Sequence, residues 1–394
     1  MTGVLAGIRV LDFGRYIAGP YCAALLAEHG AEVIRIEKRE GSEDRFQAPV
    51  TPTGDGALFM QMNRNKRGMT LDPMRPEGRE VVARLVKTAD VVVANLPPQT
   101  LSAMGLDYAS LTAIKPDVIL TTVSAFGRGG PYSDRVGFDG VGQVMSGAVY
   151  MTGEEEQPYR AQVPWVDFGT ALHCAFGTMA ALMHRKATGE GQVVEGALLA
   201  TAVTLGNALL IEQAVKKPDR VPTGNRGQTA APVDIFKTRD GFILVQVIGE
   251  PLFRRWAKLM DEDHWLEDAR FKDDISRGDN GAVVSERMAR WCADYTTAEA
   301  LEILGKAKIP AGPVLKPQQT LDDPHIQAMG FFQATDFPGM ARPAPIAKAP
   351  VWLSQTPGAI RHRAPVLGEH TEEILTELGY DRGAIRTLRE KGVV

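Results

Sequence analysis

Short apolar runs alternate with helical patterns through the first third of the chain. Strands are predicted over residues 8–14, 32–38, 90–96 and 117–127, and helices over residues 21–31 and 77–89. Short β-branched runs joined by helices are typical of a parallel sheet that is covered by helices on both faces. The pattern therefore predicts the α/β class, with a Rossmann-like first part.

The pattern changes after a helical stretch at residues 165–215. A turn-rich segment leads into strand-like residues, with the Asp240-Gly241 pair as a hairpin turn, and amphipathic helices follow. These features predict a smaller α+β domain, after which a proline-bearing linker returns the chain to the large one. The predicted boundaries are 1–215 and 326–394 for the large domain, 228–316 for the small domain, and 216–227 and 317–325 for the linkers.

The charge balance gives no field for nucleic acid. The 394 residues carry a formal net charge of −4, and the isoelectric point is near 6.0, so no basic surface dominates the molecule. The most apolar helical stretch, ALLATAVTLGNALL from Ala197, is too short to span a bilayer. We expect a buried core helix or an interface helix there, and no membrane partner.

Cysteine and histidine usage favours a reducing compartment and no metal site. The three cysteines, Cys22, Cys174 and Cys292, lie far apart, which is typical of reduced thiols rather than of a disulfide framework. The sequence contains no HxxxH or CxxC pair, so metal-ligand spacing is missing. We expect a cytoplasmic protein without a metal.

The first strand–helix turn resembles a dinucleotide site only in part. Its sequence is FGRYIAGP, in which Gly14 and Gly19 are five residues apart, so the GxGxxG spacing is absent and NAD is not expected. Glu37 could bind a ribose, but Lys38 and Arg39 follow it directly. This basic pair suits a phosphate, and its alternative interpretation is a solvated surface pair.

A carboxylate stands where a long helix of small residues begins, in the stretch VPWVDFGTALHCAFGTMAAL from Val163. Asp167 is either the N-cap of this helix or a carboxylate nucleophile that a ligand can reach. The sequence offers no GxSxG elbow and no Cys/His signature as a competing nucleophile. We interpret His173, six residues on, as a packed core histidine.

Eight stretches together point to one family. They are VLDFGRYIAGPYCAALLAEHGAEVIRIEK, NRNKRGMTLD, DVVVANLPP, VGFDGVGQVMSG, VDFGTALHCAFGTMAAL, TGNRGQTAAPVDIFKTRDG, IPAGPV and APVLGEHTEEIL. In this order and spacing, the chain resembles the class III CoA-transferases, the family of formyl-CoA transferase and carnitine CoA-transferase, over nearly its whole length. The α-methylacyl-CoA racemases share the fold.

The resemblance implies a fold and a mechanism. The expected fold is an interlocked homodimer whose large domain is built from both chain ends. Asp167 matches the catalytic aspartate, which attacks the acyl-CoA thioester to form a mixed anhydride and then an enzyme–CoA thioester. CoA and acyl-CoA are thus the expected substrates, with a free carboxylic acid as acceptor. Such a covalent relay preserves the activation of the acyl group.

The resemblance also implies contacts for CoA. The matching positions are Tyr16, Ile17 and Ala18 beside the catalytic aspartate, Lys38 near the nucleotide phosphates, Leu71, Asn95 and Leu96 near adenine and pantetheine, Asp139 near the catalytic centre, and Arg135, one residue from a CoA-binding cation. A glycine-bearing loop of the small domain, Gly224, Asn225, Arg226, Gly227 and Gln228, matches the loop whose amides would stabilise the oxyanion.

Some positions depart from the family pattern. Ile17 replaces a glutamine of formyl-CoA transferase, which argues against formate and oxalate as substrates, and Ala103 replaces a CoA-binding cation. Phe138 stands where the racemases carry their catalytic histidine, and phenylalanine accepts no proton. Transferase chemistry is therefore favoured over a racemase or a non-catalytic CoA-binding subunit. Arg15 or Arg226 could bind the second carboxylate of an acid such as succinate.

Overall fold

The structure, a computed structural model, describes residues 3–394 and divides into two compact units. The first unit comprises the residues up to Ser146, Ala161–Ala208 and Gln327–Val394, and the second comprises Gly147–Arg160 and Leu209–Ile326. The predicted domain boundaries differ from this division in that residues 147–160 and 209–215 belong to the second unit. One reason is local pairing, since the amide of Gly224 donates to the carbonyl of Gly153 at 3.1 Å.

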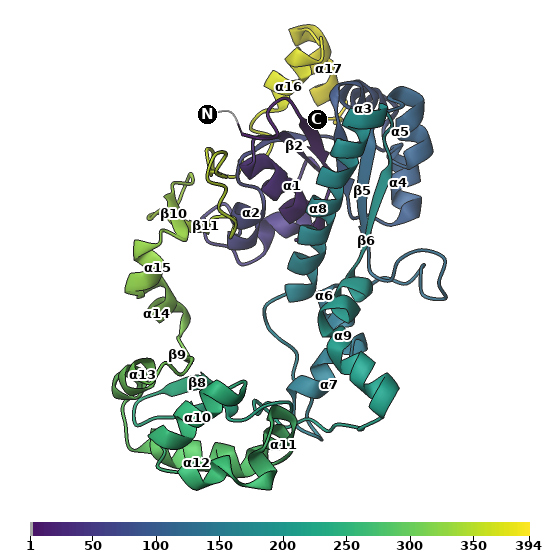
Figure 1. Cartoon of the computed structure of the whole chain (residues 1–394). Helices are drawn as coiled ribbons and strands as arrows, with labels where there is room; N and C mark the ends of the chain where they lie inside the picture. Colours follow the sequence, from purple (N-terminus) through teal and green to yellow (C-terminus); the bar gives the residue numbers. More distant parts are fainter. Residues whose placement is uncertain (1–2) are drawn as a thin grey trace. The chain divides into compact units, whose positions relative to one another are not determined.

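A six-stranded parallel sheet forms the centre of the first unit (Figure 1). Its strand order is β3 (Lys66–Thr70), β2 (Glu32–Glu37), β1 (Arg9–Asp12), β4 (Val91–Ala94), β5 (Ile119–Ser124) and β6 (Val193–Ala197). The order 3-2-1-4-5-6 is that of doubly wound sheets, in which the chain reverses direction across the sheet between β1 and β4. The predicted mixed α/β class with a parallel sheet is therefore confirmed.

Both faces of this sheet are covered, which explains why its strands read as continuous apolar runs. On one face Val10, Val33 and Ile119 pack in a cluster with α1 (Ala18–Glu28) and α8 (Trp165–Thr188). On the other face Leu11 and Ile34 pack in a cluster with helices that include α3 (Pro76–Thr88), α4 (Pro98–Met104) and α5 (Tyr108–Ile114). Neighbouring strand residues thus point to opposite layers.

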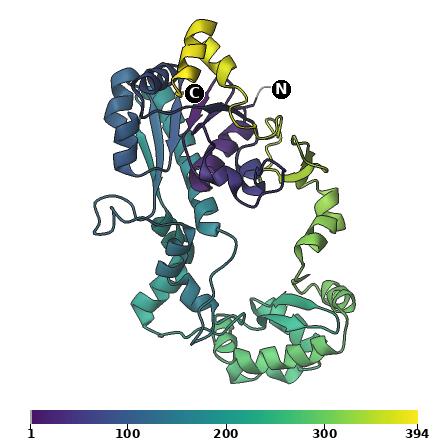
Figure 2. The same cartoon turned by 180° about the vertical axis from the view of Figure 1, so that it is seen from behind.

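The C-terminal residues complete this second layer. Helices α16 (Thr371–Glu377) and α17 (Arg382–Glu390) place Ile374, Leu375, Ile385 and Leu388 in the same cluster as β1 and β2. Both views show these yellow helices beside the strands from the start of the chain (Figure 2). The β10–β11 hairpin (Phe332–Thr335 and Ala344–Ala347) packs against α2 (Ala57–Met62). Both ends of the chain therefore build the first unit.

The second unit is a three-stranded antiparallel sheet with helices. Its strands are β7 (Val233–Lys237), β8 (Phe242–Gln246) and β9 (Ala311–Pro313), and the β7–β8 turn contains the predicted Asp240-Gly241 pair. The helices are α7 (Ala148–Thr152), α10 (Glu250–Leu259), α11 (Asp274–Asp279), α12 (Gly281–Ala293), α13 (Thr297–Lys306) and α14 (Pro317–Asp322), with α15 (Pro324–Ala328) at its end. The predicted linker 317–325 is thus mostly helical, since Pro317 and Pro324 each occupy a first helical position.

Two long apolar helices are only partly covered in the single chain. By length and composition, α8 and α9 (Leu198–Lys216) could cross a membrane, and their most apolar windows are 44% and 17% buried. A core helix of a soluble protein meets the same criterion. The helix that contains the stretch from Ala197 is longer than the sequence suggested. The core-helix interpretation is wrong, because Leu205, Ile211 and Val215 of α9 are exposed. These side chains are available for an interface.

Candidate active site

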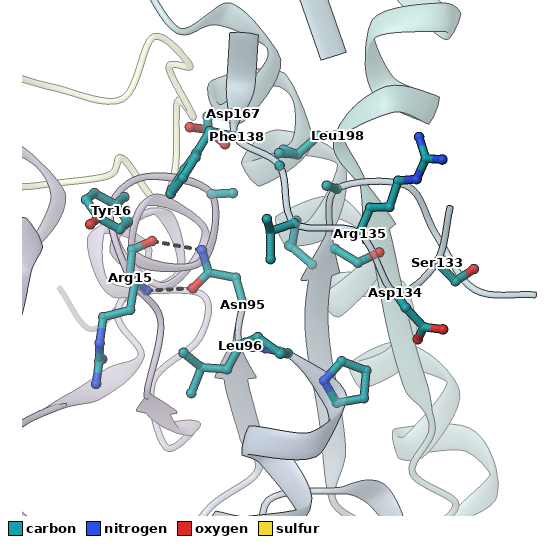
Figure 3. A pocket seen from close by; sticks show the side chains of 18 of the residues that line it. Arg15, Tyr16, Asn95, Leu96, Ser133, Asp134, Arg135, Phe138, Asp167 and Leu198 are labelled. Carbon is teal, nitrogen blue, oxygen red and sulfur yellow. Dashed lines mark hydrogen bonds between the residues drawn. The ribbon is translucent and has the colours of Figure 1, made fainter. Parts of the chain in front are cut away.

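A cavity of about 300 Å³ lies at the carboxyl ends of β1, β4 and β5 (Figure 3). The strand order reverses between β1 and β4, and doubly wound folds bind their ligands at such switch points. Residues that follow the three strands line the cavity together with the first turn of α8. We call it the Asp167 cavity; its wall includes Tyr16, Asn95, Ser124, Phe138 and Asp167.

The side-chain amide of Asn95 holds the loop between β1 and α1. Asn95 Oδ1 accepts from Arg15 N at 2.6 Å, and Asn95 Nδ2 donates to Arg15 O at 2.8 Å, as Figure 3 shows. Gly19 packs against this clamp, because a Cβ there would lie 3.1 Å from Asn95 Oδ1. Tyr16 follows with a φ of 60°, a conformation that costs a non-glycine residue about 1 kcal/mol. The clamp thus maintains a strained loop at the cavity wall.

Buried charges support the same loop from beneath. The carboxylate of Asp12 accepts from Gly14 N at 2.8 Å and from Lys66 Nζ at 2.7 Å. The guanidinium of Arg35 donates to the carbonyl of Gly14. The side chains of Asp12, Lys66 and Arg35 are completely buried, and burial lowers the pKa of Lys66 to about 8 although Asp12 opposes the shift. Both backbone groups of Gly14 are therefore bound by buried ionic side chains.

Asp167 lies in the first turn of α8, but it is not the N-cap. That position belongs to Pro164, which makes no side-chain capping bond. The carboxylate of Asp139, from the start of α6 (Asp139–Met145), accepts instead from Val166 N at 2.8 Å and from Asp167 N at 3.0 Å. The N-cap interpretation of Asp167 is therefore wrong, and its carboxyl group is left to face the cavity.

The environment of Asp167 disfavours its charged form. Burial, and then the neighbouring carboxylate of Asp139, raise the pKa of Asp167 to about 7. A carboxylate that is costly to ionise is a stronger nucleophile and base than an ordinary one. Perturbed groups of this kind inside a cavity are typical of catalytic positions.

An aromatic pair lies next to the carboxyl group of Asp167. The rings of Tyr16 and Phe138 meet edge to face with centroids 5.6 Å apart, and Figure 3 shows Phe138 beside Asp167. Phe138 is 65% exposed, so its ring forms part of an open rim rather than of the core. Neither ring carries an imidazole-like nitrogen that could accept a proton beside the carboxylate.

A second cavity, of about 500 Å³, lies at the ends of β1, β2 and β3. We call it the Lys38 cavity; Arg39, Leu71 and Arg75 also line it, and it shares Arg15 and Leu96 with the Asp167 cavity. Lys38 is half exposed and pairs with Glu43. Glu37 also lines the cavity, but its buried carboxylate is already paired with Arg45, whose Nε lies 3.0 Å away. The wall of this cavity carries several cations that suit phosphates.

Comparisons with known proteins identify the family. The model of CoA-transferase family III matches residues 5–371. Succinyl-CoA–D-citramalate CoA-transferase of Chloroflexus aurantiacus is 32% identical over 400 residues, covering 99% of this chain and 98% of that protein. Succinate–glutarate CoA-transferase of Agrobacterium fabrum is 33% identical over 386 residues, covering 95% of each. The chain belongs to CoA-transferase family III. It is therefore an enzyme of this class, as the sequence motifs implied.

Solved structures agree with this membership. A CAIB/BAIF family protein from Brucella suis matches with a TM-score of 0.83 at 31% identity, covering 96% of this chain and 100% of that one. Rv3272 from Mycobacterium tuberculosis also matches with a TM-score of 0.83, at 26% identity, covering 95% of this chain and 99% of that one. A family III enzyme acts on CoA thioesters, so the two cavities are candidate parts of one CoA site.

The structure brings most of the predicted family III site residues together. Tyr16, Ile17, Ala18, Asn95, Leu96, Arg135 and Asp167 line the Asp167 cavity, and Lys38, Leu71 and Leu96 line the Lys38 cavity. Asp139 lines neither cavity, since its carboxylate is turned to the backbone of α8. Arg135 stacks on Tyr132, with its guanidinium carbon 3.9 Å from the ring centroid.

The predicted oxyanion loop lies in the second unit. Arg226 N donates to Thr223 O at 3.2 Å and Gly227 N to Val233 O at 2.7 Å, so these two amides are already bonded to backbone carbonyls next to the loop. The guanidinium of Arg226 lies against Gly281, the first residue of α12. Gly224 has a φ of 63° and open space at its Cβ position. The role of this loop stays a prediction.

The prediction for His173 is wrong. His173 is exposed rather than packed in the core. Within residues 3–394, no group of three His, Cys, Asp or Glu side chains could hold a metal ion. Sequence reasoning missed Gln143, which is buried and holds Asp139; no local motif marks it.

Proposed function

We propose that this enzyme transfers CoA from an acyl-CoA donor to a free carboxylic acid through covalent intermediates on Asp167. The observation that carries the proposal is the carboxyl group of Asp167 in a cavity wall, at a helix start, with a pKa raised to about 7. Near neutral pH a substantial share of such a group is ionised, and burial makes the ion reactive.

The proposed reaction balances in two halves. Asp167 Oδ attacks the thioester carbonyl, the C–S bond breaks, and CoA leaves as a thiolate with the electron pair. The thiolate attacks Cγ of Asp167, and the donor acid leaves as a carboxylate. The acceptor carboxylate then attacks Cγ of the Asp167 thioester, and CoA leaves again as the thiolate. The thiolate attacks the acceptor carbonyl of the new anhydride, the new acyl-CoA forms, and Asp167 leaves as the free carboxylate. No net hydrolysis occurs as long as water is kept from the anhydride.

The cavities support this pathway. CoA is long, and the Asp167 and Lys38 cavities share Arg15 and Leu96, so one extended substrate can contact both. Its phosphates would meet Lys38, Arg39 and Arg75, and its thioester end would meet Tyr16 and Asp167. The predicted contacts of Ile17, Ala18 and Leu71 follow the same path. Asn95 would act by fixing the loop through Arg15.

The first test is product mass spectrometry in D2O, with succinyl-CoA and a 2-methylacyl-CoA as alternative donors and a panel of free acids. We expect new acyl-CoA species that carry no deuterium at the α-carbon. Deuterium at the α-carbon without exchange of CoA would make the enzyme a 2-methylacyl-CoA racemase, the alternative function. Phe138 argues against that outcome, because it replaces a proton-accepting side chain beside Asp167.

The acceptor is proposed to be a small dicarboxylate such as succinate. Relatives are named for succinate, glutarate and D-citramalate. Of the two arginines considered for the second carboxylate, Arg15 turns its guanidinium away from Asp167 in Figure 3. Burial lowers the pKa of Arg15, and its Nη1 is bound to the carbonyls of Phe13 and Gly14. Arg15 therefore suits CoA, and Arg226 is the candidate for the acid.

Replacing Arg226 by glutamine is expected to lower kcat/KM for succinate by about tenfold or more and to leave kcat/KM for butyrate unchanged, because a charge-assisted hydrogen bond of about 1.5–3 kcal/mol is lost only with the diacid. The matched variant Arg15→Gln should raise KM for acyl-CoA with both acids. Steady-state kinetics with succinate and butyrate as acceptors separate the two. Equal losses for both acids in Arg226→Gln would remove this arginine as the residue that reads the second carboxylate.

A homodimer, interlocked as in the family, is part of the proposal. The exposed apolar side chains of α8 and α9, among them Phe176, Met183 and Leu205, form a surface that a second copy of the chain could cover. Cytoplasmic residence fits the three unpaired cysteines, all buried.

A further inference from the structure

The buried carboxylate of Asp139 stands directly behind the proposed nucleophile. Its Oδ2 accepts from Val166 N at 2.8 Å and from Asp167 N at 3.0 Å. Only 7% of Asp139 is exposed. The negative charge is thus held a single peptide unit from the side chain of Asp167, in a region where water screens little.

Gln143 completes the hydrogen bonding of this carboxylate. The amide of Ala161 donates to Gln143 Oε1 at 3.0 Å, which turns Gln143 Nε2 toward Asp139 Oδ1. Both oxygens of Asp139 therefore accept hydrogen bonds from N–H groups. N–H donors on both oxygens are the partners that an aspartate carboxylate requires when it is buried. All of these donors are uncharged, so the negative charge is solvated but not neutralised.

We propose that Asp139 is a positioning residue, whose carboxylate fixes the first turn of α8 and favours the departure of negative charge from Asp167 during acyl transfer. The inference rests on the proposed function of Asp167. In the first step the charge of the Asp167 carboxylate passes to the CoA thiolate, and Asp167 stays neutral in the anhydride and in the thioester. Repulsion from Asp139 is present in the free carboxylate and relieved in each covalent intermediate.

The surroundings of Asp167 single out Asp139 for this role. Arg15, Tyr16, Asp134 and Arg135 line the same cavity from the two loops that face α8. Burial and Asp139 are nonetheless the causes that raise the pKa of Asp167. Against α8, the neighbouring helix α1 contributes Tyr21, whose ring meets Phe168. Asp139 is also the group bound to the backbone amide of Asp167 itself.

The test changes the charge at residue 139 while the hydrogen bonds to the first turn of α8 are kept. In Asp139→Asn the asparagine oxygen can still accept from Val166 N and Asp167 N, so the cap is retained while the charge is lost. The double variant Asp139→Asn/Gln143→Glu returns the negative charge to the neighbouring side chain, which lies farther from Asp167. It also restores a donor–acceptor match between the two side chains. Asp139→Ala removes both cap and charge and reports the structural contribution.

For Asp139→Asn we expect the acidic limb of the kcat/KM profile to move down by about one pH unit, and for the double variant we expect a smaller shift in the same direction. At pH 8 we expect kcat, and the fraction of enzyme trapped as the Asp167–CoA thioester, to fall about threefold. A crossing profile, faster than wild type at pH 5.5 and slower at pH 8, distinguishes this role from simple damage to the fold. Melting temperature and intact mass are measured in parallel.

The outcomes separate the two proposals. If Asp167→Ala retains full transfer activity, the proposed function fails and the role of Asp139 fails with it. If Asp167 is essential and forms the adduct, but the pH limb and the adduct fraction of Asp139→Asn equal those of wild type, the role of Asp139 alone is overturned. If Asp139→Asn does not fold, the double variant with its restored hydrogen bonds decides.

Discussion

Replacing Asp167 by asparagine is expected to abolish CoA transfer and to stabilise the protein at neutral pH. The amide keeps the size of the side chain but cannot act as an anionic nucleophile, and loss of a nucleophile costs about 10⁴-fold or more in kcat. Asp167→Ala should be equally inactive. Acyl-CoA products and the covalent adduct, followed by mass spectrometry, check this result. Transfer at a tenth of the wild-type rate in both variants would exclude covalent chemistry on Asp167.

The stability gain follows from the raised pKa. Asp167 in the folded state loses its proton near pH 7, whereas an unfolded aspartate loses it near pH 4. Between these values the folded state binds the proton and the unfolded state does not, so wild-type stability falls as the pH rises from about 4 to about 7. Asparagine does not titrate, and the advantage of Asp167→Asn should grow across this window and stay constant above it.

Melting temperatures of wild type and Asp167→Asn at pH 5, 6, 7 and 8, at one protein concentration, measure this difference. A gain equivalent to one pKa unit corresponds to about 1.4 kcal/mol. A pH-independent difference between the two proteins would contradict the pKa near 7. The same titration predicts that kcat/KM of the wild type rises with pH through about 7, because the carboxylate is the reactive form.

The elements that could be predicted from the sequence are those whose signals are local. Strand β4 reads as VVVA and is fully buried, so its burial on both faces is visible as an unbroken apolar run. The β7–β8 hairpin is marked by the Asp240-Gly241 turn, whose chemistry depends on neighbouring residues. Asp167 was found for a similar reason, since a carboxylate at the start of a helix of small residues is a local feature.

Other elements depend on partners that are distant in the sequence. Strand β3 reads as KRGMT, with two charged residues, a glycine and no apolar run. It lies in the sheet because Lys66 pairs with Asp12, and Arg67 with Glu32 and Glu377. The capping of α8 is similar, since Asp139 supplies the carboxylate from another helix. The Lys66–Asp12 bond joins residues 54 positions apart, and the Val166–Asp139 bond joins residues 27 positions apart. Patterns within a single segment cannot predict such bonds.

Exposure is the property that sequence reasoning judged least well. His173 was expected to pack in the core, and α9 was expected to be a buried core helix or an interface helix, because both are embedded in apolar stretches. In the single chain, Leu205 and Val215 are exposed instead. A hydrophobic side chain signals that it will be covered, but it does not tell whether its own chain or a second copy covers it. The same ambiguity explains why α8 and α9 meet a composition criterion for membrane helices.

Replacing Lys66 by methionine is expected to destabilise the first unit by about 3 kcal/mol, because it leaves a buried charge without its main partner. Lys66 Nζ donates to Asp12 Oδ2 at 2.7 Å, to Pro20 O at 2.7 Å and to Asn63 Oδ1 at 2.9 Å. Methionine fills the space but donates nothing, so the carbonyl of Pro20 and the carboxylate of Asp12 lose a donor. Arg35, 3.6 Å from Asp12, offsets part of the loss.

The matched control is Lys306→Met, which removes an exposed pair with Glu302 on α13 and should change stability by less than about 0.5 kcal/mol. Because the protein has two units, hydrogen exchange of peptides from β1 and α1 is the appropriate measurement. Protection there should fall in Lys66→Met and recover partly in Asp12→Asn/Lys66→Met, since the double variant removes the unpaired charge. An equal effect of Lys66→Met and Lys306→Met would show that the buried pair contributes no more than a surface one. Because Asp12 also binds the amide of Gly14, the same variant should loosen the Gly14–Tyr16 turn and raise KM for acyl-CoA.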